Sequence, residues 1–74
     1  MIVKTLGERI RYARTRKHTT QEQLAKQLYV ARNTVSSWEC NRTEPELYMM
    51  VKLSKCLDVS LDFLFTGKPE PEKS

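Results

Sequence analysis

The stretch Gln27–Glu39, QLYVARNTVSSWE, decides the fold of this chain because two segments with helical spacing meet inside it. Leu24 and Leu28 are one helical turn apart before the junction, and Val35 and Trp38 are similarly spaced after it. The junction itself, LYVA, contains no glycine or proline to turn the chain and no side chain that could cap the following helix. The sequence therefore predicts two helices joined by about three residues that lack the usual turn signals.

Helical spacing continues along the chain, and no stretch alternates with the period of a strand. The capping boxes TLGE and TQEQ start the first two helices, and Ser60 caps the last. Asn41 suits the left-handed conformation that ends the third helix, and Pro45 suits the first turn of the fourth. We therefore expect an all-α fold, a compact bundle of five helices, in one domain over residues 1–67, followed by a disordered polar tail over residues 68–74.

Each expected helix carries apolar residues on one face, and together these faces predict the core. Trp38 could instead stack on a nucleic-acid base, but its helical register with Val35 favours the core. The residues expected to face inward are Leu6, Ile10 and Ala13, then Leu24, Ala25 and Leu28, then Val35 and Trp38, then Leu47, Met50, Val51, Ser54 and Leu57, and finally Leu61, Leu64 and Phe65.

Chain length and composition exclude several classes of protein. A chain of 74 residues buries one small core and can hardly form a catalytic pocket, so we do not expect an enzyme. No apolar run is long enough to cross a bilayer, and the N-terminus lacks the apolar segment of a signal peptide, so we expect a cytoplasmic protein with no membrane partner. The spacing of Cys40, Cys56 and His18 favours reduced thiols and predicts no metal site.

Positive charge is concentrated in the first part of the chain. Residues 1–43 hold nine Lys or Arg and three acidic residues, whereas residues 44–74 hold four and six. This asymmetry favours attraction to a polyanion, although a solvated surface that aids solubility would give the same balance. Charge alone leaves both interpretations open.

Two short helices joined by about three residues, the second with one apolar and one polar face, form the helix-turn-helix pattern. Here the segment TQEQLAKQLYVARNTVSSWE, with RIRYAR before it and VSLDFLFTG after it, resembles the Cro and phage-repressor type of helix-turn-helix domain, the XRE family, over about residues 5–67. The resemblance implies a lambda-repressor-like bundle, a transcriptional regulator that binds double-stranded DNA sequence-specifically, and a homodimer. We expect no cofactor and no small-molecule ligand.

The outer face of the third helix is the expected base-reading surface. At about 100° per residue, Asn33, Ser36 and Ser37 point away from the apolar side, and Arg32 lies at the exposed N-terminal end. Arginine can pair bidentately with guanine and asparagine with adenine, while short serines let a helix approach the bases closely. Outside a helix-turn-helix pattern, such a face would be an ordinary solvated one. The resemblance implies base contacts at Arg32, Asn33 and Ser37 in particular.

Phosphate contacts are expected at the start of the second helix and in the loop after the third, because free N–H groups at a helix N-terminus attract anions and both places flank the groove. The candidate residues are Gln21, Asn41, Arg42 and Thr43. By resemblance, Arg14 and Glu39 occupy two positions that form a structural ion pair between the first helix and the end of the third.

The turn departs from the family pattern, in which glycine is common at the place of Tyr29 and serine or threonine at the place of Ala31. A left-handed Tyr29 would cost about 1–2 kcal/mol, and an uncapped third helix about 0.5–2 kcal/mol more. We expect the Tyr29 ring to recover part of this cost by packing on the domain surface, and the apolar contacts of the two helices to impose the geometry.

A homodimer is expected because one recognition helix reads only a few base pairs. The C-terminal part carries little positive charge and has apolar residues beyond one core face, which predicts an interface at Phe63, Phe65, Met49 and Leu53. The alternative is that these four residues complete the core of the single chain. A second candidate function is an antitoxin whose main partner is a toxin protein, but the short polar tail is a poor partner-binding extension.

Overall fold

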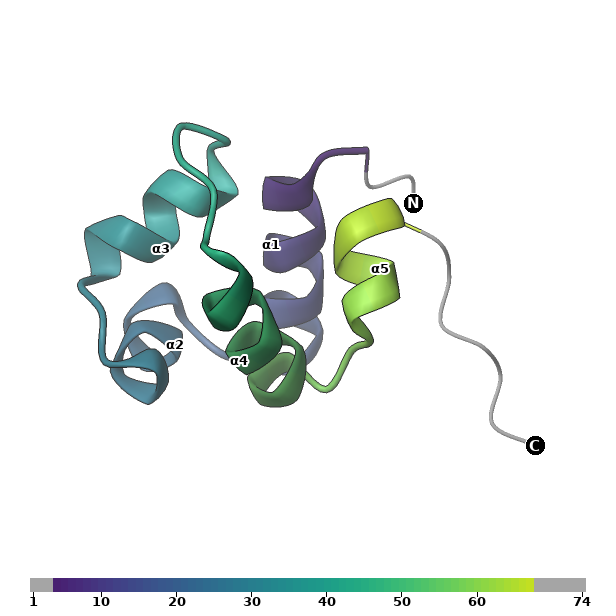
Figure 1. Ribbon diagram of the computed structural model, residues 1–74. Helices are drawn as coiled ribbons and strands as arrows, with labels where there is room; N and C mark the ends of the chain where they lie inside the picture. The colour runs from purple at the N-terminus through teal and green to yellow at the C-terminus, as the bar shows by residue number, and fades with distance from the viewer. Residues whose placement is uncertain (1–3, 68–74) are drawn as a thin grey trace.

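The structure, a computed structural model, describes residues 4–67, and this part of the chain is all helical with no strand. The fold class expected from the sequence is confirmed. Figure 1 shows α2 and α3 at one end of the bundle, with α4 crossing in front of α1 and α5 at the other end. The helices are α1 (Leu6–Arg16), α2 (Gln21–Leu28), α3 (Arg32–Glu39), α4 (Leu47–Leu57) and α5 (Leu61–Thr66). The expected tail, residues 68–74, lies outside the described residues.

Side-chain caps start three of these helices as the sequence predicts. Both capping boxes are formed, with Thr5 and Glu8 at α1 and with Thr20 and Gln23 at α2, and the Ser60 hydroxyl accepts from the third backbone N–H of α5. At α1 the backbone N–H of Thr5 donates to the Glu8 carboxylate, and this bond holds the pKa of that carboxyl below its ordinary value. The starts of α3 and α4 have no side-chain cap.

The first four helices end in the same way, although none of them ends at glycine. A left-handed residue lies one or two positions after each helix, with φ of 54° at His18, 60° at Tyr29, 62° at Asn41 and 57° at Asp58. In each case the next backbone N–H donates to the carbonyl five residues earlier, as Val30 does to Ala25 at 3.0 Å. This is the Schellman motif, in which glycine is the usual left-handed residue. The left-handed conformation expected of Tyr29 is therefore confirmed.

The Tyr29 ring does not pack on the domain surface, and that expectation was wrong. The residue is 92% exposed. Its backbone is fixed by the Schellman bonds at the end of α2, and the flanking Val30 packs against the core in its place. The strain at Tyr29 is therefore offset by its neighbours rather than by its own side chain.

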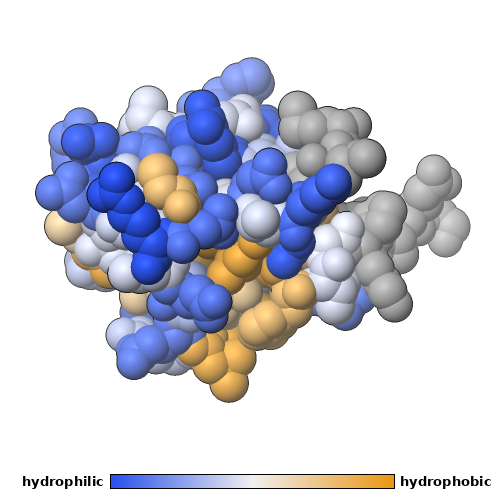
Figure 2. All heavy atoms as spheres, turned by 90° about the horizontal axis from the view of Figure 1, so that it is seen from above, coloured by the Kyte–Doolittle hydropathy of each residue, from blue (hydrophilic) through white to orange (hydrophobic). Residues whose placement is uncertain are grey.

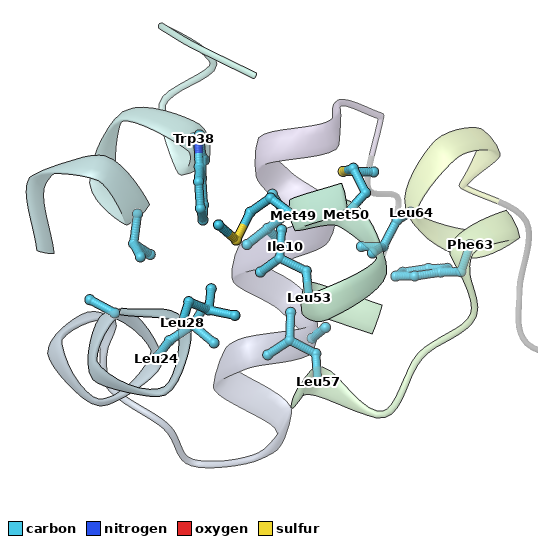
Figure 3. Packing of buried hydrophobic residues seen from close by; sticks show 13 residues of the cluster. Ile10, Leu24, Leu28, Trp38, Met49, Met50, Leu53, Leu57, Phe63 and Leu64 are labelled. Carbon is cyan, nitrogen blue, oxygen red and sulfur yellow. The ribbon is translucent and has the colours of Figure 1, made fainter. Parts of the chain in front are cut away.

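One apolar core is formed where all five helices meet (Figure 3). Trp38 is 5% exposed and extends from α3 toward α4, which confirms its assignment to the core. Large side chains buried this completely contribute about 1.5–3 kcal/mol each. The buried apolar residues are Ile10, Ala13, Leu24, Ala25, Leu28, Val35, Trp38, Met49, Met50, Leu53, Leu57, Phe63 and Leu64.

The sequence misplaced the start of α4 and part of its inward face, although Met50 and Leu57 are buried as expected. Pro45 lies before the helix, because Glu46 is extended with ψ of 163° and the chain needs an extended segment to pass from α3 to α4. Leu47 was expected in the core but is 68% exposed, whereas Met49 and Leu53 are buried. The helix has two adjacent apolar stripes, and α4 turns the Met49–Leu53 stripe toward the other helices because it packs against α1, α2 and α5 together.

The N-terminus of α1 and the C-terminus of α3 touch at Gly7. A β-carbon on Gly7 would lie 2.5 Å from the carbonyl oxygens of Trp38 and Glu39, so only glycine fits this contact. The Asn41 side chain closes the same junction, since its Oδ1 accepts from the Gly7 N–H and its Nδ2 donates to the Thr5 hydroxyl, both at 3.0 Å. Helix α3 is thus fastened to α1 at its C-terminal end.

Candidate nucleic-acid interface

Helix α3 presents its polar face outward. Val35 and Trp38 are buried on the core side, while Arg32 and Asn33 are exposed and Ser36, on the outer side, is half-buried. Ser37 is half-buried beside Asn33 on the same face. In the described part of the chain, no intramolecular side-chain hydrogen bond engages Asn33, Ser36 or Ser37. Their donors and acceptors are therefore available to an external partner.

The four residues expected to contact phosphate lie in different environments. Arg42 and Thr43 are exposed in the loop after α3, and their side chains are free within residues 4–67. Asn41 is exposed too, but both ends of its amide are used at the junction with α1. These two bonds give Asn41 a structural role at the junction that the sequence did not indicate, and its Nδ2 keeps a second N–H that could donate to a phosphate. Gln21 is half-buried at the start of α2.

The ion pair between Arg14 and Glu39 is present and largely removed from solvent. The two side chains are 11% and 4% exposed, and Arg14 Nε donates to Glu39 Oε2 at 2.6 Å while Nη2 donates to Oε1 at 3.1 Å. Arg14 Nη1 also donates to the backbone carbonyl of Thr19 at 2.7 Å. Such a bidentate pair with an additional carbonyl bond satisfies both charges in a partly desolvated site. It joins α1 to the end of α3 and to the start of α2.

Gln21 extends this network to the first residue of α3. Its Nε2 donates to Glu39 Oε1 at 3.0 Å, and its Oε1 accepts from Arg32 Nη1 at 3.2 Å. From the sequence, Gln21 was expected only to contact phosphate. Arg32 and Glu39 lie 11 and 18 positions further along the chain, and no local sequence pattern links residues so far apart. An open hollow of about 480 Å³ lies beside this network, and its lining includes Gln21, Arg32, Arg14 and His18.

The expected dimer interface lies mostly in the core. Met49 and Phe63 are each 6% exposed and Leu53 is 0% exposed, so these three complete the core of the single chain, which was the alternative. Of the four residues only Phe65, which is 53% exposed, remains available to a partner. Phe63 faces inward because α5 packs against both α1 and α4, and this turns Phe65 outward.

Residues 4–67 contain no cluster of three or more His, Cys, Asp or Glu side chains that could hold a metal ion. Both cysteines are free, with Cys40 exposed and Cys56 half-buried. None of the five helices is long and apolar enough to span a bilayer.

Comparison with known proteins identifies the family. Residues 10–64 match the helix-turn-helix family. The chain belongs to this family, in its Cro and phage-repressor branch. Helix-turn-helix relatives include the transcriptional activator BcrR of Enterococcus faecalis, which is 41% identical over 84% of this chain and 30% of its own length. The repressor protein C2 of Salmonella phage P22 is 37% identical over 90% of this chain and 31% of its own length.

Solved helix-turn-helix structures superimpose on this domain closely. The P22 c2 repressor in complex with a synthetic operator gives a TM-score of 0.83 at 37% identity, covering 88% of this chain and 98% of that one. SinR, a master regulator of biofilm formation, in complex with DNA gives a TM-score of 0.76 at 35% identity, covering 82% and 98%. These relatives are DNA-binding regulators and not enzymes. The chain spans between about a third and a half of the length of BcrR, C2 and DicA of Escherichia coli.

Proposed function

We propose that this helix-turn-helix protein is a cytoplasmic, sequence-specific regulator of transcription that binds double-stranded DNA, most simply a repressor that occupies an operator. The observation that carries the proposal is the outer face of α3, where Asn33, Ser36 and Ser37 have unengaged polar groups on a helix fixed from behind by Val35 and Trp38. A rigid polar helix of this width fits the major groove. The relatives named above are regulators, which supports this function rather than that of an antitoxin.

The residues that contact base edges lie in the first turns of α3. Arg32 is exposed at the start of the helix and can pair with the O6 and N7 acceptors of guanine, and Asn33 can pair with N6 and N7 of adenine. Ser36 and Ser37 lie further along the same face and are short enough for close approach to bases or phosphates. Each bidentate contact provides about 1–3 kcal/mol of discrimination against the wrong base pair.

Phosphate contacts surround this reading face. Arg42 and Thr43 extend from the loop after α3, and Gln21 stands at the N-terminus of α2, where backbone N–H groups favour anions. Each phosphate neutralised by a cationic side chain steepens the salt dependence of binding by a log–log slope of about 0.9. Arg42→Ala should therefore weaken binding to all DNA sequences and reduce that slope by about 1. An unchanged slope would show that Arg42 does not contact a phosphate.

Selection of bound sites from a random DNA pool tests the function and its specificity together. The wild type should enrich one motif, and Arg32→Ala or Asn33→Ala should lose about 1–3 kcal/mol on that motif and much less on random DNA. Equal losses on both kinds of DNA would make the two residues backbone contacts. A pool in which the wild type enriches nothing would contradict sequence-specific binding.

We also propose that the protein binds a palindromic operator as a homodimer, with two copies of α3 about 34 Å apart on one face of the duplex. The exposed apolar side chains offered to the second copy are Leu47 at 68% and Tyr48 at 59% on α4, and Phe65 at 53% on α5. Figure 2, seen from above, shows apolar surface gathered at the edge where α4 lies nearest the viewer in Figure 1. Exposed apolar surface of this kind marks interaction sites.

Sedimentation tests this assembly because Phe65 is exposed and can be changed without opening the core. Phe65→Glu should shift the protein toward monomer and reduce affinity for a palindrome, while Phe63→Leu, a change inside the core, should leave assembly intact. A wild type that is monomeric at tens of micromolar and binds a half-site as tightly as a palindrome would refute the dimer. A Phe65→Glu protein that still dimerises would exclude this surface.

A further inference from the structure

His18, the only histidine of the chain, is exposed in the loop between α1 and α2. Its backbone is left-handed, with φ of 54°, and the N–H groups of His18 and Thr19 donate to the carbonyls of Thr15 and Arg14 at 3.0 and 3.2 Å. Within residues 4–67 the imidazole itself makes no hydrogen bond. The backbone of the loop is therefore fixed, while the ring is available to an external partner.

The imidazole lines the open hollow of about 480 Å³ beside α2. Gln21, the first residue of α2, and Arg32, the first residue of α3, line the same hollow. In the proposed function, Gln21 contacts a phosphate and Arg32 contacts a base. His18 therefore lies at the edge of the proposed DNA interface, on the side nearest α1.

The start of α2 provides free backbone donors beside this hollow. The Thr20 hydroxyl accepts from the Gln23 N–H and the Thr20 carbonyl accepts from the Leu24 N–H. The N–H groups of Gln21 and Glu22 have no acceptor within the described part of the chain. Free N–H groups at a helix N-terminus favour an anion, so a DNA phosphate bound here would lie beside the His18 ring.

The charges around the imidazole make its protonation decisive for the charge of the hollow. Arg14 of α1 is neutralised by its ion pair, and in the loop the Lys17 ammonium donates to a backbone carbonyl of α4. The remaining charged lining residues, Glu22 of α2 and Arg32 of α3, are exposed and carry opposite charges. A protonated His18 consequently gives the hollow a net positive charge, which a neutral His18 does not.

We propose that His18 is a protonation-dependent phosphate contact that makes the DNA affinity of this protein fall as the pH rises through neutrality. This inference rests on the proposed function, since it needs the hollow to face the DNA backbone. An imidazole in water changes charge at about pH 6.5, and its protonated form has a charge and two N–H donors where the neutral form has one donor and no charge. The DNA-bound protein therefore holds more protons than the free protein, and by linkage the affinity is greatest in acid and declines as the proton is lost.

The experiment measures the affinity of the untagged chain for DNA by fluorescence anisotropy, at about pH 6 and about pH 8 and at several salt concentrations. The wild type is compared with His18→Gln, which is neutral at both pH values, and with His18→Arg, which is charged at both. All three residues have a β-carbon, so the backbone strain at this left-handed position is matched.

A second histidine position provides the matched control. The double variant His18→Gln, Lys52→His has one imidazole, as the wild type does, but carries it on α4. Lys52 is exposed and does not line the hollow. This variant therefore keeps the number of titrating imidazoles and changes only their place.

We expect the wild-type affinity to fall by about 3- to 10-fold for each bound copy between the two pH values. The fall should be equal on a selected site and on random DNA, because a phosphate contact reads no sequence, and the log–log salt slope should decrease by up to about 0.9. His18→Gln and the double variant should bind weakly at both pH values, and His18→Arg should bind tightly at both. A neutral methylphosphonate at one backbone position of each half-site should abolish the pH dependence.

Three results would overturn the proposal: a wild-type affinity that does not change with pH, a pH dependence that persists in His18→Gln, or one confined to the selected site. Melting temperatures of the wild type and both single variants should agree within about 2 °C at each pH; a wild-type melting temperature that falls together with its affinity would assign the effect to folding. Binding to a selected motif without pH dependence would refute this inference and leave the proposed function intact. A wild type that binds no DNA at either pH would refute the proposed function itself.

Discussion

Replacing Tyr29 by glycine should stabilise the domain, which is unusual for the removal of an aromatic side chain. Tyr29 has φ of 60° and is 92% exposed, so its backbone is strained while its ring buries almost nothing. A left-handed residue with a β-carbon costs about 1–2 kcal/mol, and glycine removes this cost. Glycine also adds about 0.5–1 kcal/mol of chain entropy to the unfolded state. Subtracting the two ranges leaves about 0–1.5 kcal/mol, with a central net gain of about 0.5–1 kcal/mol.

For a domain of this size that gain corresponds to a rise in melting temperature of about 2–8 °C, measurable by thermal denaturation followed by circular dichroism. Tyr29→Ala distinguishes the effect of backbone strain from that of the ring, because alanine keeps the β-carbon and lacks the ring. The stability of this variant should stay within about 0.5 kcal/mol of the wild type. His18→Gly, at φ of 54° in the same motif after α1, should also stabilise.

Asn41→Gly is the opposing control. Asn41 has φ of 62°, but its amide bonds to Gly7 and Thr5, and those bonds should outweigh any relief of strain. A lower melting temperature for both Tyr29→Gly and Tyr29→Ala would refute the reasoning, because it would show that the ring stabilises the fold. A gain for Asn41→Gly equal to that for Tyr29→Gly would refute the structural role of the Asn41 amide.

Three further substitutions probe the fastening of α3, each by chemical denaturation. Gly7→Ala should destabilise by about 1–3 kcal/mol or more, since its β-carbon would lie 2.5 Å from two backbone oxygens; wild-type stability would contradict that contact. Glu39→Ala should cost about 3–5 kcal/mol because it leaves Arg14 largely buried without its partner, and a loss below about 1 kcal/mol would mean that solvent replaces the pair. Ala31→Ser should stabilise by about 0.5–2 kcal/mol, because Ala31 has extended cap dihedrals and the new hydroxyl can accept from the Asn33 N–H or share the Thr34 N–H, which already donates to the Ala31 carbonyl at 3.0 Å; no gain would show that the added hydroxyl does not cap the helix.

The helices were predictable from sequence wherever a local signal defines them. Both capping boxes, the Ser60 cap and the end of α3 at Asn41 follow from interactions within a few residues, and the structure places them as expected. The inward face of α4 did not follow, because Leu47 and Met49 lie on adjacent apolar stripes and only packing against three other helices selects between them. On α5, the sequence likewise left open whether Phe63 or Phe65 faces the core.

The candidate site shows the same division between local and long-range information. The outer face of α3 follows from helical periodicity around Val35 and Trp38, and resemblance supplied the pair of Arg14 with Glu39. The link from Gln21 to both ends of α3 could not be predicted, because it depends on how α2 lies against α3 and leaves no periodic pattern. Asn41 was predicted as a helix stop, but its amide bonds to α1 depend on tertiary contact.

The position of α3 is therefore set by contacts with other helices rather than by its own ends. α3 has eight residues, an uncapped N-terminus and a strained residue before it, so it would be a poor helix in isolation. Its C-terminal end is held at Gly7 and through Glu39, and its N-terminal residue Arg32 is held through Gln21. Because Glu39 belongs to both the ion pair and the link to Arg32, changes at Glu39 should affect stability and DNA binding together, whereas changes at Gln21, which lies outside the core, should affect DNA binding with little loss of stability.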